Sequence, residues 1–223
     1  MKRFLLICLS LVLALVGWST VGAEDGFYVI PAMKGKYAPV PKTGQTNTYG
    51  VTGTDGALQK GVAWPTPRFT DNGNGTVTDK LTGLMWQKNA NCMKSHYPGF
   101  DNDATLGDGA VTWVHALGFV AGINNGTYPL CGAGYSDWRL PNVKELQSLI
   151  DYGFYGPALP DTLGTGKWTE GNPFQGVKTA NYWSSSTLAS LTTYAWLVPF
   201  SDGYVGVNNK NDSYYVWPVR GGK

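Results

Sequence analysis

The residues best suited to chemistry in this chain are polar and aromatic side chains between its last two predicted strands. Aromatic rings are flat apolar platforms for the faces of sugars, and neighbouring amides and hydroxyls can read sugar hydroxyl groups. Because loops on a rigid scaffold often carry binding residues, we expect ligand contact in this loop. The predicted ligand-binding set is Tyr204, Asn208, Asn209, Lys210, Asn211, Asp212 and Tyr214.

The chain is rich in aromatic residues throughout, with nine Trp, thirteen Tyr and eight Phe. Several tryptophans lie in segments that are typical of strands or helices, so we expect them to fill the core rather than to contact a ligand. These tryptophans are Trp86, Trp113, Trp138, Trp183 and Trp196.

Two stretches rich in Asp and Asn offer the hard oxygen ligands that calcium prefers. They are residues 71–74 and 101–108, the second containing Asp101, Asn102, Asp103 and Asp108. Calcium takes about six to eight oxygens, and neither stretch has the EF-hand spacing with its closing Glu. The sugar-binding triplets EPN, QPD and WND of C-type lectins are absent as well. Asx-type turns explain both stretches, so we predict no metal site, and calcium binding stays an open alternative.

Residues for catalysis are sparse. The two histidines are His96, in a predicted loop, and His115, on a predicted helix. No serine lies in a nucleophile elbow, and Ser184, Ser185 and Ser186 are typical of a strand edge. No Gly-rich phosphate loop follows a strand. The sequence therefore predicts no catalytic residue and no cofactor.

The N-terminus has the pattern of a secretory signal peptide over residues 1–23. Lys2 and Arg3 precede an apolar run over 4–16, and residues 21–23 have the small side chains of a cleavage site. A membrane anchor is the alternative, but Ser, Gly and Thr dilute the run, and a spanning helix needs about 20 apolar residues. We therefore expect export to the periplasm, the cell surface or the medium, with no membrane attachment after cleavage.

The mature chain from Glu24 is expected to form a leader over 24–63 and one domain over 64–223. The 17 basic residues exceed the 15 acidic ones by two, and that excess is Lys2 and Arg3 of the signal peptide. A neutral mature chain has no long-range attraction for nucleic acid, although a local basic patch is compatible with this composition.

Two cysteines remain after the predicted cleavage removes Cys8. An even count in an exported protein indicates one disulfide, between Cys92 and Cys131. A reactive thiol pair is the alternative, but the two residues lack CxxC spacing.

Two helices and several strands are expected to position these residues. Thr112 can cap a helix over 113–121, with Trp113, Leu117 and Val120 on one face and Gly122 near its end. A second helix over 142–151 has Asn142 and Glu145 at capping-box spacing and ends before Gly153. Its apolar stripe is Val143, Leu146, Leu149 and Ile150.

The strand signals surround these helices. Two Asn-Gly pairs in residues 72–75 predict a hairpin, and residues 81–86 continue as a strand. Residues 88–110 look like a loop, pinned by Cys92. Alternation over 194–199, a turn at Asp202-Gly203, a returning strand over 204–207 and a last strand over 214–219 predict an antiparallel meander. The residue pattern therefore indicates an α+β fold.

Four segments in order resemble the Legionella collagen-like protein C-terminal domain family over about residues 64–222. They are 69–86 (FTDNGNGTVTDKLTGLMW), 134–152 (GYSDWRLPNVKELQSLIDY), 181–187 (NYWSSST) and 201–222 (SDGYVGVNNKNDSYYVWPVRGG). The WRLP segment with its capped helix, and the closing Val219-Arg220-Gly221, also resemble the formylglycine-generating enzyme group. That second resemblance implies a C-type-lectin-like architecture.

The chain departs from these families in ways that limit the comparison. It has no Gly-X-Y tract, so trimerisation through a collagen-like stalk does not carry over. Relatives have a cysteine in a Cys-Val-Arg segment where this chain has Pro218, which leaves Cys92–Cys131 as its one bridge. The copper-binding cysteine pair of formylglycine-generating enzymes has no counterpart here.

The resemblance implies an adhesive module, because the family's collagen-like member binds sulfated glycans. We therefore expect an exported, non-enzymatic module that binds extracellular or cell-surface glycans. The alternatives are a protein-binding structural component of a bacterial surface assembly and, third, an oxidase of the formylglycine-generating type. If the loop over 204–214 is not the binding face, the loop around residues 88–110 is the alternative. The identity of the ligand and the oligomeric state stay open.

Overall fold

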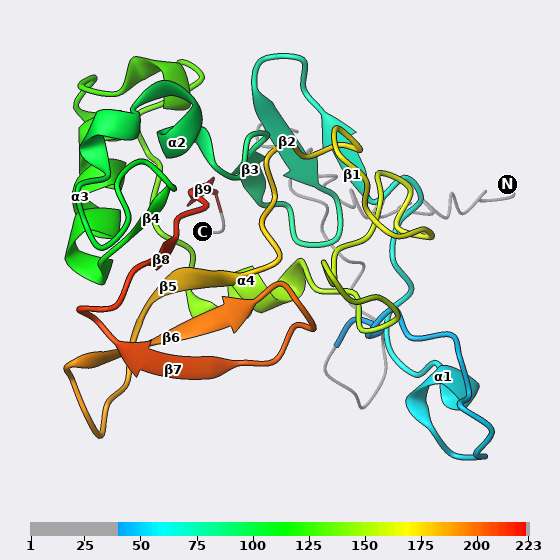
Figure 1. The fold of residues 1–223 in the computed structure, drawn as a ribbon. Helices are drawn as coiled ribbons and strands as arrows, with labels where there is room; N and C mark the ends of the chain where they lie inside the picture. The colour runs from blue at the N-terminus through cyan, green and yellow to red at the C-terminus, as the bar shows by residue number, and fades with distance from the viewer. Residues whose placement is uncertain (1–39, 222–223) are drawn as a thin grey trace, which may run out of the picture.

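Two small sheets, with helices packed beside them, form the core of the computed structural model, which describes residues 40–221 (Figure 1). One sheet has the strand order β1-β2-β3-β9 and the other the order β4-β8-β5-β6-β7. The predicted α+β class is confirmed. The elements are α1 (Asp55–Leu58), β1 (Phe69–Asp71), β2 (Thr76–Asp79), β3 (Met85–Gln87), α2 (Cys92–His96), η1 (Pro98–Phe100), β4 (Ala110–Val111), α3 (Trp113–Asn124), η2 (Pro129–Cys131), α4 (Val143–Ser148), β5 (Asn181–Thr187), β6 (Tyr194–Pro199), β7 (Gly206–Asn209), β8 (Tyr214–Tyr215) and β9 (Val219–Arg220).

The first sheet starts with the predicted hairpin. Strands β1 and β2 pair antiparallel with Phe69 opposite Asp79, and the connection closes with the Asn72 amide donating to the Thr76 carbonyl at 3.0 Å. Gly73 and Gly75 both have positive φ, which is the backbone conformation that the Asn-Gly pairs predict. The hairpin prediction is therefore confirmed. The strand predicted over 81–86 is shorter and later, because residues 80–82 form a turn and β3 begins at Met85.

The second sheet separates two hydrophobic cores. Side chains alternate along strands, so Trp183 and its partner Leu197 face the core that contains α3. Tyr182 and its partner Val198 face the core that contains α4. Figure 1 shows α4 behind β5 and β6, in line with these two sets of contacts.

The last predicted strand, over 214–219, is wrong as a single element. Its first part, β8, joins β4 and β5 in the second sheet, whereas β9 pairs with β3 in the first. Trp217 lies buried between them, and its indole N–H donates to the Gln87 carbonyl at 2.8 Å. Pro218 has no N–H for a ladder bond, which favours this break. The pairing of β5 with β8 is parallel, so the sheet is also not purely antiparallel.

Helix α4 has the predicted capping box. The Asn142 side chain accepts from the amides of Lys144 and Glu145, and the Glu145 carboxylate accepts from the Asn142 amide at 2.8 Å. Leu146 and Leu149 are fully buried. The helix ends at Ser148, earlier than predicted, because the chain turns there to pair the amide of residue 151 with the carbonyl of residue 158.

Helix α3 runs three residues past its predicted end. Its buried face is Ala116, Phe119, Val120 and Ile123, while Trp113 and Leu117 are only partly buried. The Thr112 side chain makes no cap hydrogen bond, so that part of the prediction is wrong. Instead the Thr112 amide donates to the Asp103 carboxylate at 2.6 Å.

The segment 88–110, predicted as a loop, contains α2, η1 and β4. The predicted disulfide is present: Cys92 and Cys131 are bonded, and they join α2 to η2. Of the tryptophans expected in the core, Trp86, Trp138 and Trp183 are buried. Trp113 and Trp196 are half-buried: Trp113 is the first residue of α3, and Trp196 pairs with Val207 of β7, the edge strand of the second sheet.

The described part of the predicted leader, residues 40–63, docks on the domain rather than running fully extended. It contains the short helix α1, and the Thr43 carbonyl accepts from the Tyr152 amide at 2.9 Å. Gly44 lies so close to Asp151 that an added Cβ would be 2.1 Å from the carboxylate. The predicted signal peptide and residues 24–39 lie outside the described residues. Between residues 40 and 221, no helix is both long and apolar enough to cross a membrane.

We predict that Leu146→Ala lowers the free energy of unfolding by about 2–5 kcal/mol, because it empties a fully buried site. Asn142→Ala should cost about 1 kcal/mol through loss of the cap. Lys144→Ala, on the exposed face of the same helix, is the control and should change little. Chemical denaturation measures all three. Equal, negligible effects in the first two variants would contradict the packing described for α4.

We predict that the protein processed at the expected site has no free thiol. Replacing Cys92 and Cys131 together by Ser should lower stability by roughly 4 kcal/mol in the chain-entropy model for a loop of this length. Intact mass after alkylation, with and without reductant, counts the thiols. Two alkylated cysteines in the native, unreduced protein would contradict the bridge.

Candidate functional site

The predicted ligand-binding set is divided by the structure. Three of its members come together: the Asn208 amide donates to the Tyr214 hydroxyl, and the Tyr204 ring lies over Gly206 on the same face of β7. Tyr204 is about half exposed. Burial raises the pKa of the Tyr214 hydroxyl above its usual value, and the nearby charge of Asp212 adds to the shift.

The other members hold the chain in place or extend into solvent. The Lys210 ammonium lies 4.0 Å from the centroid of the Trp113 ring and donates to the Thr187 hydroxyl at 2.8 Å. The Lys210 carbonyl accepts from the Trp113 amide at 3.0 Å, so this residue ties the loop to α3. Asn209 accepts from the Asn211 amide in a local turn. These contacts within the protein account for the presence of Lys210 and Asn209 without a ligand.

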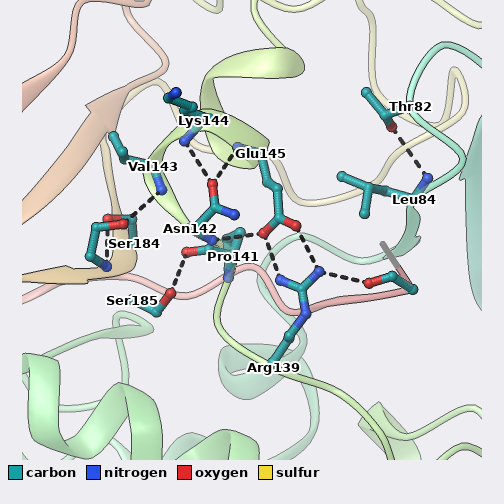
Figure 2. A network of polar contacts seen from close by, with 12 residues as sticks. Thr82, Leu84, Arg139, Pro141, Asn142, Val143, Lys144, Glu145, Ser184 and Ser185 are labelled. Carbon is teal, nitrogen blue, oxygen red and sulfur yellow. Dashed lines mark hydrogen bonds and ion pairs between the residues drawn. The ribbon is translucent and has the colours of Figure 1, made fainter. Parts of the chain in front are cut away.

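A groove of about 570 Å³ lies between α3 and the segment 138–142. Figure 2 shows the polar network beside it. The Arg139 guanidinium forms a two-pronged ion pair with Glu145, at 2.6 and 2.7 Å, and also donates to the Gly221 carbonyl at 2.7 Å. The Asn124 side chain donates to the Trp138 carbonyl and accepts from the Trp138 amide. These polar groups bind one another, so the network holds α4 to the segment 138–142.

A second hollow, of about 580 Å³, is lined by aromatic residues. We call it the aromatic hollow. Its lining residues are His96, Tyr97, Pro98, Gly99, Phe100, Asn102, His115 and Tyr128. It contains both histidines of the chain, and its rings come from α2, η1, α3 and the segment that precedes η2.

The rings of the aromatic hollow support one another. Phe100 packs edge-on against Tyr128 with centroids 5.4 Å apart, and Tyr97 lies 4.9 Å from Tyr128. Below them, Phe119 stacks on Tyr128 at 5.2 Å and is itself buried. Tyr97, Phe100 and Tyr128 are half-buried, so each ring is fixed on one side and retains surface on the other.

Gly122 makes room for one of these rings. A Cβ on Gly122 would be 2.3 Å from the Tyr128 ring, closer than any real contact. The sequence suggested that this glycine marks the end of the helix, but α3 continues to Asn124. Gly122 therefore has a packing role, because its lack of a side chain leaves the space that the Tyr128 ring occupies.

The rim of the aromatic hollow is polar. Nδ1 of His115 lies 2.8 Å from the Asp103 carboxylate at ion-pair distance, although the contact lacks hydrogen-bond geometry. His96 and Asn102 are exposed, and neither side chain has a hydrogen-bond partner among the residues that the structure describes. Donors and acceptors therefore stand beside the aromatic surface without internal partners.

The disulfide braces the aromatic hollow from behind. Cys92 begins α2 and Cys131 ends η2, so the bridge holds together the two segments that carry Tyr97 and Tyr128. The Tyr97 hydroxyl accepts from the Leu130 amide at 2.9 Å, which adds a second link between them.

The Asp- and Asn-rich stretches form local turns. The Asp71 carboxylate accepts from the Gly73 amide at 3.0 Å and pairs with Lys88 at 2.7 Å. Asp101 is buried, which raises the pKa of its carboxyl, and it accepts from the Gly109 amide at 2.7 Å. In the described range, no group of three or more His, Cys, Asp or Glu side chains is arranged to hold a metal ion.

The sequence indicates the segment 88–110 only as the alternative binding face, and it does not predict the hollow. The signal available was local: Tyr97, Phe100 and His96 lie close together in a segment that also contains Pro98 and Gly99. The contribution of α3 and Tyr128 carries no such signal, because it depends on the tertiary packing.

The fold and these hollows describe a small disulfide-braced α+β module with an aromatic surface site. The chain belongs to the Lcl C-terminal domain family, whose model matches residues 75–220, as its four characteristic segments predicted. Comparison with curated proteins finds no match.

We predict opposite effects for two glycines of α3. Gly122→Ala should destabilise the fold and displace the Tyr128 ring, because of the contact described above. Gly118→Ala is the matched control: its Cβ meets no atom within 4 Å, so it should stabilise by about 0.5–1 kcal/mol through helix propensity. Thermal unfolding and tyrosine fluorescence measure both. Equal stabilisation by both changes would contradict the placement of Tyr128.

Proposed function

We propose that this protein is an exported, non-enzymatic binding module for extracellular or cell-surface glycans, and that the aromatic hollow is its binding site. The observation that supports this most is the arrangement of Tyr97, Phe100 and Tyr128. These rings are fixed by buried neighbours and keep free surface beside the unpartnered polar groups of His96 and Asn102. Flat apolar surface with hydrogen-bonding groups at its edge matches the two kinds of surface on a sugar ring.

The rigidity of the hollow favours binding over a loose surface contact. The disulfide, the Tyr97–Leu130 hydrogen bond and the Phe119 packing hold the rings before a ligand arrives. Less conformational entropy is then lost on binding. The loop with Tyr204 has an exposed ring but fewer fixed neighbours, so it is the second choice for a sugar contact.

Binding rather than catalysis is favoured by the residues that line the hollow. The His115–Asp103 contact resembles the base and orienting acid of a nucleophilic enzyme. A nucleophile is needed beside them, and the lining residues contain no Ser, Thr or Cys. Both cysteines of the domain are held in the disulfide, which supports binding over an oxidase of the formylglycine-generating type.

The C-type-lectin-like architecture implied by the sequence also belongs to this proposal. It is supported by the short sheets, the helices beside them and the long irregular segment between α4 and β5. Export is supported by the N-terminal pattern and by the disulfide, which is stable in oxidising compartments.

A protein-binding role in a surface assembly is the second candidate. Three large apolar side chains are more than three-fifths exposed on segments that adjoin the hollow, namely Leu106, Val114 and Leu130. Such side chains suit a protein partner better than a sugar. They are separate from the rings, so variants can distinguish the two functions.

We predict that Phe100→Leu and Tyr128→Leu each weaken glycan binding about tenfold or more, because leucine retains apolar volume but has no flat ring face; tenfold corresponds to about 1.4 kcal/mol. Tyr204→Leu is the matched control and should bind as wild type. The measurement is a glycan array followed by calorimetric titration of the best ligand. Loss in the Tyr204 variant alone would move the site to the loop over 204–214.

Salt dependence provides an independent check. Because the mature chain is neutral, binding through the hollow should weaken only modestly between low and physiological salt. A steep salt slope that disappears in Lys210→Ala would indicate a basic polyanion site instead. Binding to a protein partner that is lost in Leu130→Ser, with no glycan bound, would favour the surface-assembly role.

A further inference from the structure

A smaller hollow lies next to the aromatic one and is lined differently. We call it the amide hollow. It has a volume of about 190 Å³, and four of its lining residues are the amide side chains Asn74, Gln87, Asn89 and Gln175. The bonded cysteines also line it. The Asn74 and Asn89 amides are bonded within the described part of the protein, whereas the Gln175 amide and the Oε1 of Gln87 are not, so the hollow keeps groups that can pair with another amide or a hydroxyl.

The two hollows share a wall. His96 lines both of them, and it is the last residue of α2. Leu130 lines the amide hollow, while its backbone amide donates to the hydroxyl of Tyr97 in the aromatic hollow. One ligand that passes over the exposed His96 imidazole can therefore contact both hollows.

The amide hollow is held rigidly. The Asn89 side chain donates to Ser95 at 2.9 Å and accepts from the Asn91 amide at 2.9 Å. The backbone of Gln175 pairs with its neighbours on both sides, accepting from Ala90 at 2.8 Å and donating to Lys88 at 2.8 Å. Its exposed side-chain amide makes no hydrogen bond to any described residue.

One lining side chain has a buried acceptor without a hydrogen-bond donor. Gln87 is 3% exposed, and its Nε2 donates to the Cys131 carbonyl, whereas its Oε1 has no hydrogen-bond partner among the described residues. A buried acceptor without a donor is unfavourable. An N–H or O–H group that enters the hollow and reaches this oxygen would satisfy it.

The charge of the amide hollow indicates a neutral ligand. Its one ammonium group, that of Lys88, is paired with Asp71 at 2.7 Å. The remaining donors are amides and the imidazole of His96. A sulfate or carboxylate group would thus lose its hydration without meeting an unpaired cation.

We propose that the ligand is a neutral oligosaccharide with acetamido groups that spans both hollows across His96. An acetamido group has an N–H and a carbonyl that match the amide side chains, and a methyl group that packs on an aromatic ring. One sugar ring would lie against Phe100 and Tyr128, and a following unit would enter the amide hollow. This inference rests on the proposed function and adds its ligand class and length.

The test uses N-acetylglucosamine and its oligomers up to the hexamer as probes, with glucose oligomers of the same linkage and length as controls lacking the acetamido group. We expect affinity to rise about tenfold or more between the monomer and the longer oligomers, and the glucose series to bind more weakly at every length. Gln175→Ala should remove most of the gain with length. Gln59→Ala, an exposed glutamine on the arm before the domain, should behave as wild type.

The outcomes separate this inference from the proposed function. Binding that does not change with length, and is unaffected by Gln175→Ala, would overturn the bridging while leaving a sugar site at the aromatic hollow. Equal or tighter binding of the glucose series, or array hits restricted to charged glycans that depend on Phe100, would overturn the acetamido class. Absence of every glycan from the array would instead remove the proposed function itself.

Discussion

The carboxylate of Glu145 holds helix α4 to the segment around Arg139 and, through that segment, to β9. It closes the capping box of α4 by accepting from the Asn142 amide, and it holds the Arg139 guanidinium through two short contacts. Arg139 in turn exchanges backbone hydrogen bonds with Val219 of β9. One side chain therefore joins the helix beneath the second sheet to the strand that completes the first. With its polar groups paired in this way, the network shown in Figure 2 has a structural role.

The proposed binding sites lie away from this joint. The segment Trp138-Arg139-Leu140-Pro141 packs and pairs internally, with Trp138 and Leu140 buried. The aromatic hollow forms instead between α2, η1 and α3, and the amide hollow is lined by residues of α2, η2 and the end of β3, beside the disulfide.

The proposed sites depend on buried residues that hold the exposed rings in place, and not on the exposed residues alone. Phe119 and Gly122 belong to α3, yet their effect is to set the plane of the Tyr128 ring. The proposed recognition relies on shape and on short-range hydrogen bonds, because basic and acidic residues are equal in number after residue 23. Rings held in this way lose less conformational entropy when a ligand binds.

Signals within a few residues allowed the sequence by itself to determine the α4 cap, the Asn-Gly hairpin, the buried Leu146 and the family. The Cys92–Cys131 bridge could also be predicted, because Cys8 lies in the predicted signal peptide and the two other cysteines permit one pairing. Only the tertiary structure decided that residues 214–220 divide between two sheets, that Gly122 seats Tyr128 and that His96 stands between two hollows. The physical reason is the distance along the chain over which each feature is specified. A cap or a turn is specified by neighbouring residues. A hollow is made by side chains from distant segments, and their contacts produce no periodic pattern in the sequence.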